Sequence, residues 1–230
     1  MDDEVTRRVR EGLPVLEFVA RRLAKRVGGE VAFDDLMSLG HPALLEVART
    51  FDPTRAKFST FAALKVKWAI LDGLRREAMF GRAAAARAAA LSASTRFGEG
   101  LAALDAGEDR ELATEDVYQS RLRSLLEGHT AALALGLLAV QGDPDAIPGG
   151  AETPEESASK AELKRAVAAA IQKLPEREHA LIERHYFGGE AFDAIARDLG
   201  ISKSWASRLH ASAIRSLAAS LGSLRAAELP

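Results

Sequence analysis

The 230-residue sequence contains no cysteine. Disulfide bonds, cysteine-ligated zinc and thiol catalysis are therefore excluded, and a cytoplasmic protein is expected. β-branched residues are sparse and no segment alternates polar and apolar side chains, so no strands are predicted. The longest apolar run, residues 131–140, is too short to span a bilayer, and no signal peptide is visible at the N-terminus.

Motifs of common catalytic sites are also missing. The sequence has no glycine-rich phosphate-binding motif and no nucleophilic serine motif. His179 and His185 are six residues apart, a spacing that does not place two metal ligands on one helix face. We therefore expect no enzyme, no catalytic residue, no metal site and no cofactor.

Alanine and leucine dominate what is present, which favours an all-α protein. We expect a multi-domain helical protein with a C-terminal four-helix helix-turn-helix domain. The net charge is about +5 over residues 1–97, −10 over residues 98–159 and +3 over residues 160–230. Two basic ends suit two nucleic-acid surfaces. Chance variation on solvated helices explains the same pattern.

Prolines, glycines and carboxylates concentrate between residues 141 and 156, which is typical of a linker. The sequence therefore predicts four parts. A first domain covers residues 1–80, a middle helical region 81–140, an acidic linker 141–158 and a helix-turn-helix domain 159–230. Within the first domain, Gly12 to Pro14 predict a break in the first helix.

Aromatic and cationic side chains alternate in residues 51–77. Asp52 and Pro53 predict a turn, followed by a helix from near Lys57 to the pair Arg75 and Arg76. Rings and cations on one rigid helix suit unstacked bases and the phosphates between them. Phe51 is assigned to core packing. For Phe58 and Phe61 the residues alone leave core packing and DNA binding equally open.

A second set of candidates lies near the C-terminus. Residues 192–199 predict a short helix, Gly200 and Ile201 a tight turn, and Ser202 the N-cap of a further helix. The first turns of that helix would meet base edges and phosphates in a major groove. Its candidate DNA-binding residues are Lys203, Ser204, Ser207 and Arg208, whereas Trp205 can equally pack against the preceding helix.

Two blocks of the sequence resemble bacterial RNA polymerase sigma factors. Residues 51–62, followed by residues 70–77, resemble the promoter-melting segment, and residues 174–179 with 194–217 resemble the domain that reads the upstream promoter element. The likeness covers roughly residues 14–80 and 160–220. It is greatest for the flagellar and sporulation-type alternative sigma factors.

This resemblance implies a protein that binds core RNA polymerase, directs it to promoter DNA and helps to open the DNA, with an anti-sigma factor as a further partner. The positions that match promoter melting or strand contact are Phe58, Thr60, Phe61, Lys65 and Lys67. The positions that match polymerase docking are Asp35, Leu36, Leu44 and Leu45.

Two alternatives to a working sigma factor remain open. The first is a diverged sigma-like protein that binds polymerase or an anti-sigma factor but recognises promoters weakly. An alanine-rich stretch after Glu77, where the family has a basic segment, motivates it. The second is a regulator that uses only its helix-turn-helix, which leaves residues 51–77 unexplained.

Overall fold

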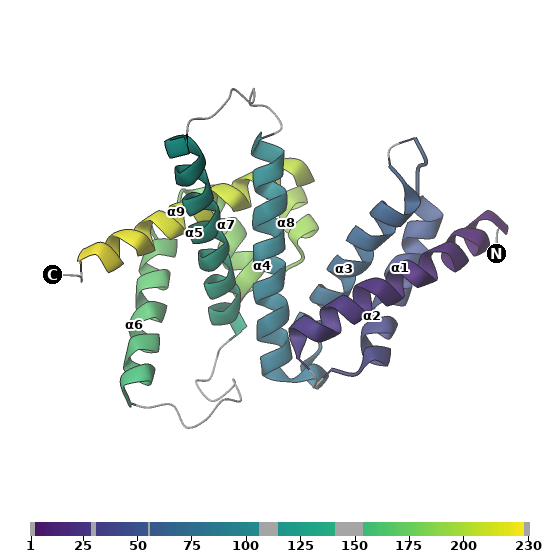
Figure 1. Cartoon of the computed structure of the whole chain (residues 1–230), viewed down its shortest axis with the longest axis horizontal. Helices are drawn as coiled ribbons and strands as arrows, with labels where there is room; N and C mark the ends of the chain where they lie inside the picture. Colours follow the sequence, from purple (N-terminus) through teal and green to yellow (C-terminus); the bar gives the residue numbers. More distant parts are fainter. Residues whose placement is uncertain (1–2, 29–30, 55, 106–114, 141–153, 228–230) are drawn as a thin grey trace. The chain divides into compact units, whose positions relative to one another are not determined.

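The chain is described by a computed structural model that covers residues 3–28, 31–54, 56–105, 115–140 and 154–227. All regular structure in these ranges is helical, which confirms the predicted all-α fold (Figure 1). No helix among these residues is long and apolar enough to cross a membrane. The helices are α1 (Asp3–Val27), α2 (Phe33–Thr50), α3 (Phe58–Arg76), η1 (Ala78–Phe80), α4 (Gly81–Asp105), α5 (Glu115–Val140), α6 (Pro154–Ile171), α7 (Glu176–Ile182), η3 (Glu183–Phe187), α8 (Phe192–Asp198) and α9 (Lys203–Ala227).

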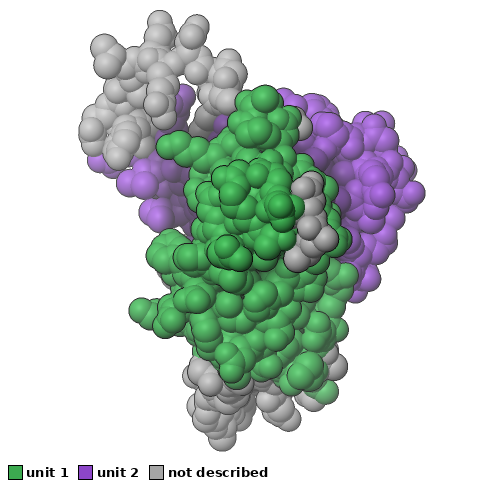
Figure 2. All heavy atoms as spheres, turned by 90° about the vertical axis from the view of Figure 1, so that its right-hand side faces the viewer, with its two compact units in different colours: residues 1–88 green, residues 89–230 purple. Residues whose placement is uncertain are grey.

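The chain groups into two compact units, residues 1–88 and residues 89–230, drawn green and purple in Figure 2. The boundary lies inside α4, so this helix begins in unit 1 and ends in unit 2. Most of the linker expected at 141–158 lies outside the described residues. The four-part division stays a prediction.

Unit 1 is built on a three-helix core of α1, α2 and α3. The predicted break at Gly12 to Pro14 is wrong, because α1 continues through Pro14. Gly12 instead lets α2 approach closely, since a Cβ atom there would collide with Leu44. Pro14 is tolerated because its ring lies on the exposed side and only one helical N–H is lost. The buried core includes Leu16, Leu23, Leu36, Leu44, Val66, Ile70 and Leu74.

The arginine inside the alanine-rich stretch has a structural partner in unit 1. Arg87 on α4 donates a hydrogen bond to the Val27 carbonyl at the end of α1, with an Nη1–O distance of 3.0 Å. A cation at a helix C-terminus satisfies an orphan carbonyl and opposes the negative end of the helix dipole. Gly28 follows with φ of 95°, a left-handed conformation that ends α1 there.

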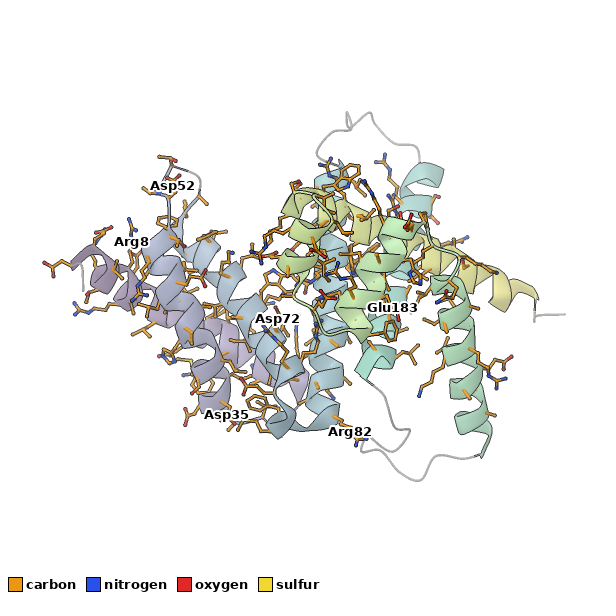
Figure 3. All side chains as sticks on the ribbon, turned by 180° about the vertical axis from the view of Figure 1, so that it is seen from behind. Arg8, Asp35, Asp52, Asp72, Arg82 and Glu183 are labelled. Atoms are coloured by element: carbon orange, nitrogen blue, oxygen red, sulfur yellow. The ribbon has the colours of Figure 1, made fainter. Side chains whose placement is uncertain are left out.

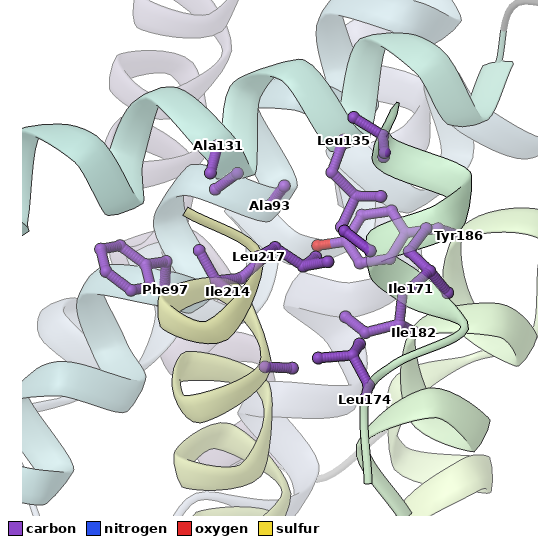
Figure 4. Close-up of a cluster of buried hydrophobic side chains, with 14 of the residues drawn as sticks. Ala93, Phe97, Ala131, Leu135, Ile171, Leu174, Ile182, Tyr186, Ile214 and Leu217 are labelled. Atoms are coloured by element: carbon purple, nitrogen blue, oxygen red, sulfur yellow. The ribbon is translucent and has the colours of Figure 1, made fainter. Parts of the chain in front are cut away.

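Unit 2 contains one shared core for the middle region and the helix-turn-helix domain (Figure 4). Phe97 of α4 packs against Gly128 of α5, where a Cβ atom would collide with its ring. The remaining core comes from several helices, including Leu135 of α5, Ile171 of α6, Tyr186 of η3 and Ile214 and Leu217 of α9. Residues 89–140 therefore do more than connect, since they complete the core on which α9 rests.

Candidate nucleic-acid interfaces

The first candidate interface begins at the turn between α2 and α3. Asp52 Oδ1 accepts hydrogen bonds from the Thr54 backbone N–H at 2.9 Å and from the Thr54 hydroxyl at 2.7 Å. A side chain that bonds the backbone two residues later stabilises a tight turn. The expected turn is therefore present, and α3 starts at Phe58, one residue from its predicted start.

Three phenylalanine rings meet at this end of unit 1. The Phe51 centroid lies 5.2 Å from that of Phe58, edge to face, and 6.0 Å from that of Phe61. Two cations cover the cluster: the Arg8 guanidinium is 5.3 Å from the Phe51 centroid and Lys65 Nζ is 5.8 Å from the Phe61 centroid. Such contacts combine ring faces with positive charge.

Arg8 is a residue that the sequence analysis missed. It also donates hydrogen bonds to the carbonyls of Ala48, at 3.2 Å, and Phe51, at 3.4 Å. Figure 3 shows Arg8 on α1 and Asp52 in the turn at the same end of this unit. No local pattern could have found this link, because Arg8 is 43 residues from Phe51 in the chain.

An open hollow of about 690 Å³ lies beside the rings. Its volume falls within the range of small-ligand sites, roughly 300–1,000 Å³. Ring faces, a cation and hydroxyl groups together suit a single nucleobase and its phosphate. The lining residues are Glu11, Phe51, Pro53, Thr54, Ala56, Lys57, Phe58 and Ser59.

The predicted strand-binding residues differ in exposure. Thr60 is exposed, and Phe61, Lys65 and Lys67 are half-buried. Phe58 lines the hollow but is only 8% exposed, so most of its ring packs in the core. A direct DNA contact by Phe58 is therefore geometrically harder than one by Phe61. The assignment of all five residues stays a prediction.

The four residues predicted to bind polymerase also divide into two groups. Leu36 and Leu44 are 0% and 1% exposed and hold α2 in the three-helix core. Asp35 and Leu45 are partly exposed on the same helix. In this conformation only Asp35 and Leu45 are accessible to a partner, and the polymerase contact itself stays a prediction.

The second candidate interface is the helix-turn-helix formed by α8 and α9. Gly200 adopts φ of 67°, and the Ile201 N–H donates to the Ala196 carbonyl at 2.9 Å. Ser202 Oγ accepts from the Trp205 N–H at 3.2 Å. The turn glycine and the N-cap serine therefore have the roles that the sequence predicts.

Arg184 fixes the position of α8. Its guanidinium donates hydrogen bonds to Glu190 Oε1 at 2.7 Å and to Asp198 Oδ2 at 2.8 Å. These two carboxylates lie just before α8 and at its last residue. The hydrogen bonds from Arg184 lower the pKa of the Glu190 carboxyl, so this clamp persists at neutral pH.

A buried polar cluster anchors α9 to the rest of unit 2. The Tyr186 hydroxyl and His210 Nε2 are 2.8 Å apart, and the Arg96 guanidinium lies 4.2 Å from the Phe192 centroid. Burial, together with the charge of Arg96, lowers the pKa of His210 to about 3. His210 is therefore neutral in the folded protein at physiological pH.

The predicted contact residues lie in the first two turns of α9. Lys203 is exposed and pairs with Asp193 of α8 at 3.1 Å. The Arg208 guanidinium lies 5.3 Å from the Trp205 ring centroid, and its buried Nε has no hydrogen-bond partner among the described residues. Ser204 is exposed, whereas the Ser207 hydroxyl donates to the Lys203 carbonyl at 3.2 Å.

Helix α4 covers one flank of α9 close to Ser207. A Cβ atom on Gly100 would collide with the Ser207 carbonyl oxygen and would lie 2.7 Å from the Ala211 Cβ. Only glycine allows the two helices to approach this closely. Ser207 is therefore less accessible than Ser204 in this conformation, and all four α9 assignments stay predictions.

Two family models match the chain where these two interfaces lie. The model for sigma-70 region 2 matches residues 9–79 and that for sigma-70 region 4 matches residues 170–219. The RNA polymerase sigma-D factor of Bacillus subtilis is 27% identical over 90% of this chain and 85% of its own length. The RNA polymerase sigma factor FliA of Pseudomonas aeruginosa is 28% identical over 93% of this chain and 89% of its own.

A solved structure of a flagellar sigma/anti-sigma complex, Sigma-28/FlgM, is also similar, with 25% identity over 95% of this chain and 96% of that chain, and a TM-score of 0.32. The two matched regions contain the ring cluster of α3 and the helix-turn-helix of α8 and α9. The chain therefore belongs to the sigma-70 family of RNA polymerase sigma factors and is similar to its sigma-D and FliA members.

Proposed function

We propose that this sigma factor binds core RNA polymerase through α2, holds a separated promoter strand beside α3 and grips upstream duplex DNA with α9. The observation that carries the proposal is the presence of two unlike surfaces within the two matched regions. One is a ring-lined hollow and the other is a helix-turn-helix.

At the first surface, a base that leaves the duplex would enter the hollow against Phe51, and the neighbouring base would stack on Phe61, whose centroid lies 6.0 Å from that of Phe51. Stacking of a base on an aromatic ring is worth roughly 1–3 kcal/mol, which offsets part of the cost of unpairing. Lys57 at the rim and Lys65 above Phe61 would neutralise the neighbouring phosphates. The strand is captured and no covalent bond changes, so we propose that this protein is not itself an enzyme.

At the second surface, α9 would enter the major groove with its N-terminal turns. Lys203 would exchange its exposed partner Asp193 for a phosphate, since exposed ion pairs contribute little. Arg208, which lies against Trp205, would donate hydrogen bonds to a guanine edge or a phosphate. Ser204 would contact a base or a phosphate, and Ser207 would do so once α4 has moved away from it.

The partners follow from this function. Core RNA polymerase supplies the catalysis and would contact α2 through Asp35 and Leu45, which are the accessible candidates. The resemblance to flagellar-type sigma factors extends the proposal to an anti-sigma factor as a further partner. Because these partners are cytoplasmic, we propose a cytoplasmic location.

Run-off transcription with purified core polymerase tests the proposal. The unsubstituted protein should give promoter-dependent RNA. Phe61→Ala should slow strand opening about tenfold, measured by permanganate reactivity of unpaired thymines, because one stacking platform is lost. Leu163→Ala, at an exposed leucine of α6, serves as the control and should open promoters normally.

Closed-complex formation should be the same for both variants. Normal opening by Phe61→Ala would contradict the role of this surface. Binding to core polymerase without any promoter-dependent RNA would favour the diverged interaction protein. Absence of affinity for core polymerase would reject the proposed function outright.

A further inference from the structure

A second aromatic–cationic surface lies on α1, outside the residues assigned above. The Phe18 side chain is 60% exposed, and the Arg22 guanidinium lies 5.6 Å from its ring centroid. Lys25 is exposed as well. Because residues 18, 22 and 25 are separated by four and seven positions, they share one face of the helix. We call Phe18, Arg22 and Lys25 the α1 stripe.

The C-terminal part of α1 is positively charged. Residues 18–27 contain four cations and no carboxylate. The stripe is defined without Arg21, because that guanidinium lies 3.6 Å from Glu17 and stacks 5.1 Å from the Phe33 centroid. A single exposed ring is ordinary on protein surfaces. An exposed ring combined with a guanidinium and an ammonium group is the combination that suits a base and its phosphates.

The stripe continues from the hollow beside α3. Glu11, which lines the hollow, precedes Phe18 by seven residues and lies on the same face of α1. With a rise of about 1.5 Å per residue, Phe18 is roughly 10 Å along the helix from Glu11, and Lys25 roughly 10 Å further. A carboxylate repels phosphate but accepts hydrogen bonds from base amino groups. Backbone contacts would therefore begin at Phe18 and Arg22.

We propose that the α1 stripe binds the single DNA strand where it leaves the hollow, with Phe18 stacking on a base and Arg22 and Lys25 neutralising phosphates. This inference rests on the proposed function, because it assigns the stripe to the same strand. The charge of the stripe and its continuity with the hollow both favour DNA. An acidic protein surface is the competing occupant and is an outcome of the test.

The first experiment measures strand affinity as a function of length. Random-sequence single-stranded DNA of about 6 and about 14 nucleotides is titrated against the protein assembled with core polymerase. The longer strand should bind more tightly to the unsubstituted protein. Phe18→Ala should lose about tenfold of affinity for the longer strand and none for the shorter one. Arg22→Gln with Lys25→Gln should reduce the slope of log affinity against log salt by about 1.4.

Arg165→Gln with Lys173→Gln is the matched control, since it removes two exposed cations from unit 2. This control should leave both affinities and the salt slope unchanged. An unchanged length dependence in Phe18→Ala and in the double variant overturns the inference while the proposed function stands. Failure of the unsubstituted protein to bind even the short strand overturns both.

The second experiment uses the absence of cysteine from the chain. Phe18→Cys carries a thiol-linked photocrosslinker, and Leu163→Cys carries the same group as a control at an exposed leucine of α6. With the long strand and core polymerase present, position 18 should cross-link to DNA and position 163 should not. Cross-linking of position 18 to a polymerase subunit in place of DNA would assign the stripe to a protein contact and overturn the inference.

Discussion

The two helices proposed to meet DNA are anchored in different ways. Helix α3 lies in an aliphatic core made with α1 and α2, to which Val66, Ile70 and Leu74 contribute. Helix α9 is anchored partly by polar groups, above all the hydrogen bond between Tyr186 and His210. Among the described residues, every buried polar or charged side chain lies in unit 2: Ser92, Arg96, Glu178, His185 and His210.

This difference matches the two tasks. Apolar packing is non-directional, whereas a buried hydrogen bond such as that between Tyr186 and His210 fixes the distance and direction between its two groups. A helix that reads base edges must hold its side chains at fixed positions in the groove. An open hollow that takes up one strand tolerates a looser fit. Burial of apolar side chains therefore stabilises unit 1, whereas polar contacts in unit 2 fix the position of α9.

The largest expected effect tests the aliphatic core of unit 1. Leu44→Ala should lower the free energy of unfolding by about 3 kcal/mol, because a fully buried side chain leaves a cavity against Gly12. Leu45→Ala is the matched variant, and it should cost little stability while weakening binding to core polymerase. Urea denaturation and a polymerase titration measure the two effects. Equal losses of stability in both variants would contradict the division between core and contact residues.

The polar anchor of unit 2 predicts that stability depends on pH between pH 6.5 and pH 5. The pKa of His210 is about 3 when folded and 6.5 in the unfolded chain. Between these values the unfolded chain binds more protons, so stability is fully present above 6.5 and falls as the pH is lowered. The expected loss is about 1.6 kcal/mol between pH 6.5 and pH 5, and the slope approaches about 1.4 kcal/mol per pH unit at the lower end of this window.

His210→Gln keeps a hydrogen-bonding group for Tyr186 and removes the titration. The slope of unfolding free energy between pH 6.5 and pH 5 should therefore be much flatter in this variant. The clamp at Glu190 contributes little in this window, because that carboxyl has an ordinary pKa of 4.5 that the clamp lowers, so it is largely ionised in the folded and unfolded states above pH 5. An identical slope in the variant and the unsubstituted protein would show that His210 is not the group responsible.

The close approach of α4 to α9 gives a smaller effect. Gly100→Ala should destabilise the protein by about 2 kcal/mol, because the added methyl group meets the Ser207 carbonyl. Gly222→Ala, at a position on α9 with open space around it, should stabilise by up to about 1 kcal/mol through helix propensity. Thermal unfolding followed by circular dichroism compares the two. Stabilisation by both substitutions would mean that α4 and α9 are not in contact at this point.

The smallest expected effect concerns the surface of α9. Lys203→Gln should reduce the slope of log DNA affinity against log salt by about 0.9, because one phosphate contact is lost. Asp193→Asn should slightly increase affinity, since Lys203 then has no competing carboxylate on α8. Fluorescence anisotropy with duplex promoter DNA measures both. A steeper slope for Lys203→Gln would be incompatible with a phosphate contact.

Features that depend on neighbours in the sequence were predicted well. The turn at Asp52, the extent of α3 and the N-cap at Ser202 each follow from hydrogen bonds or propensities within a few residues. The break expected at Gly12 was wrong, because packing against Leu44, 32 positions further along the chain, decides the role of that glycine. The hydrogen bonds from Arg8 to Phe51 and from Arg87 to Val27 could not be predicted, because they join residues that are far apart in the sequence.

By itself the sequence determined the helical fold, the two blocks that resemble sigma factors and the residues that carry rings and cations. Only the tertiary structure decided which of those residues face solvent, since it buries Phe58, Leu36 and Leu44 and leaves Phe18 exposed. The physical reason is that periodicity fixes the face of a helix on which a residue lies. Which face is covered depends on partner helices that are distant in the chain.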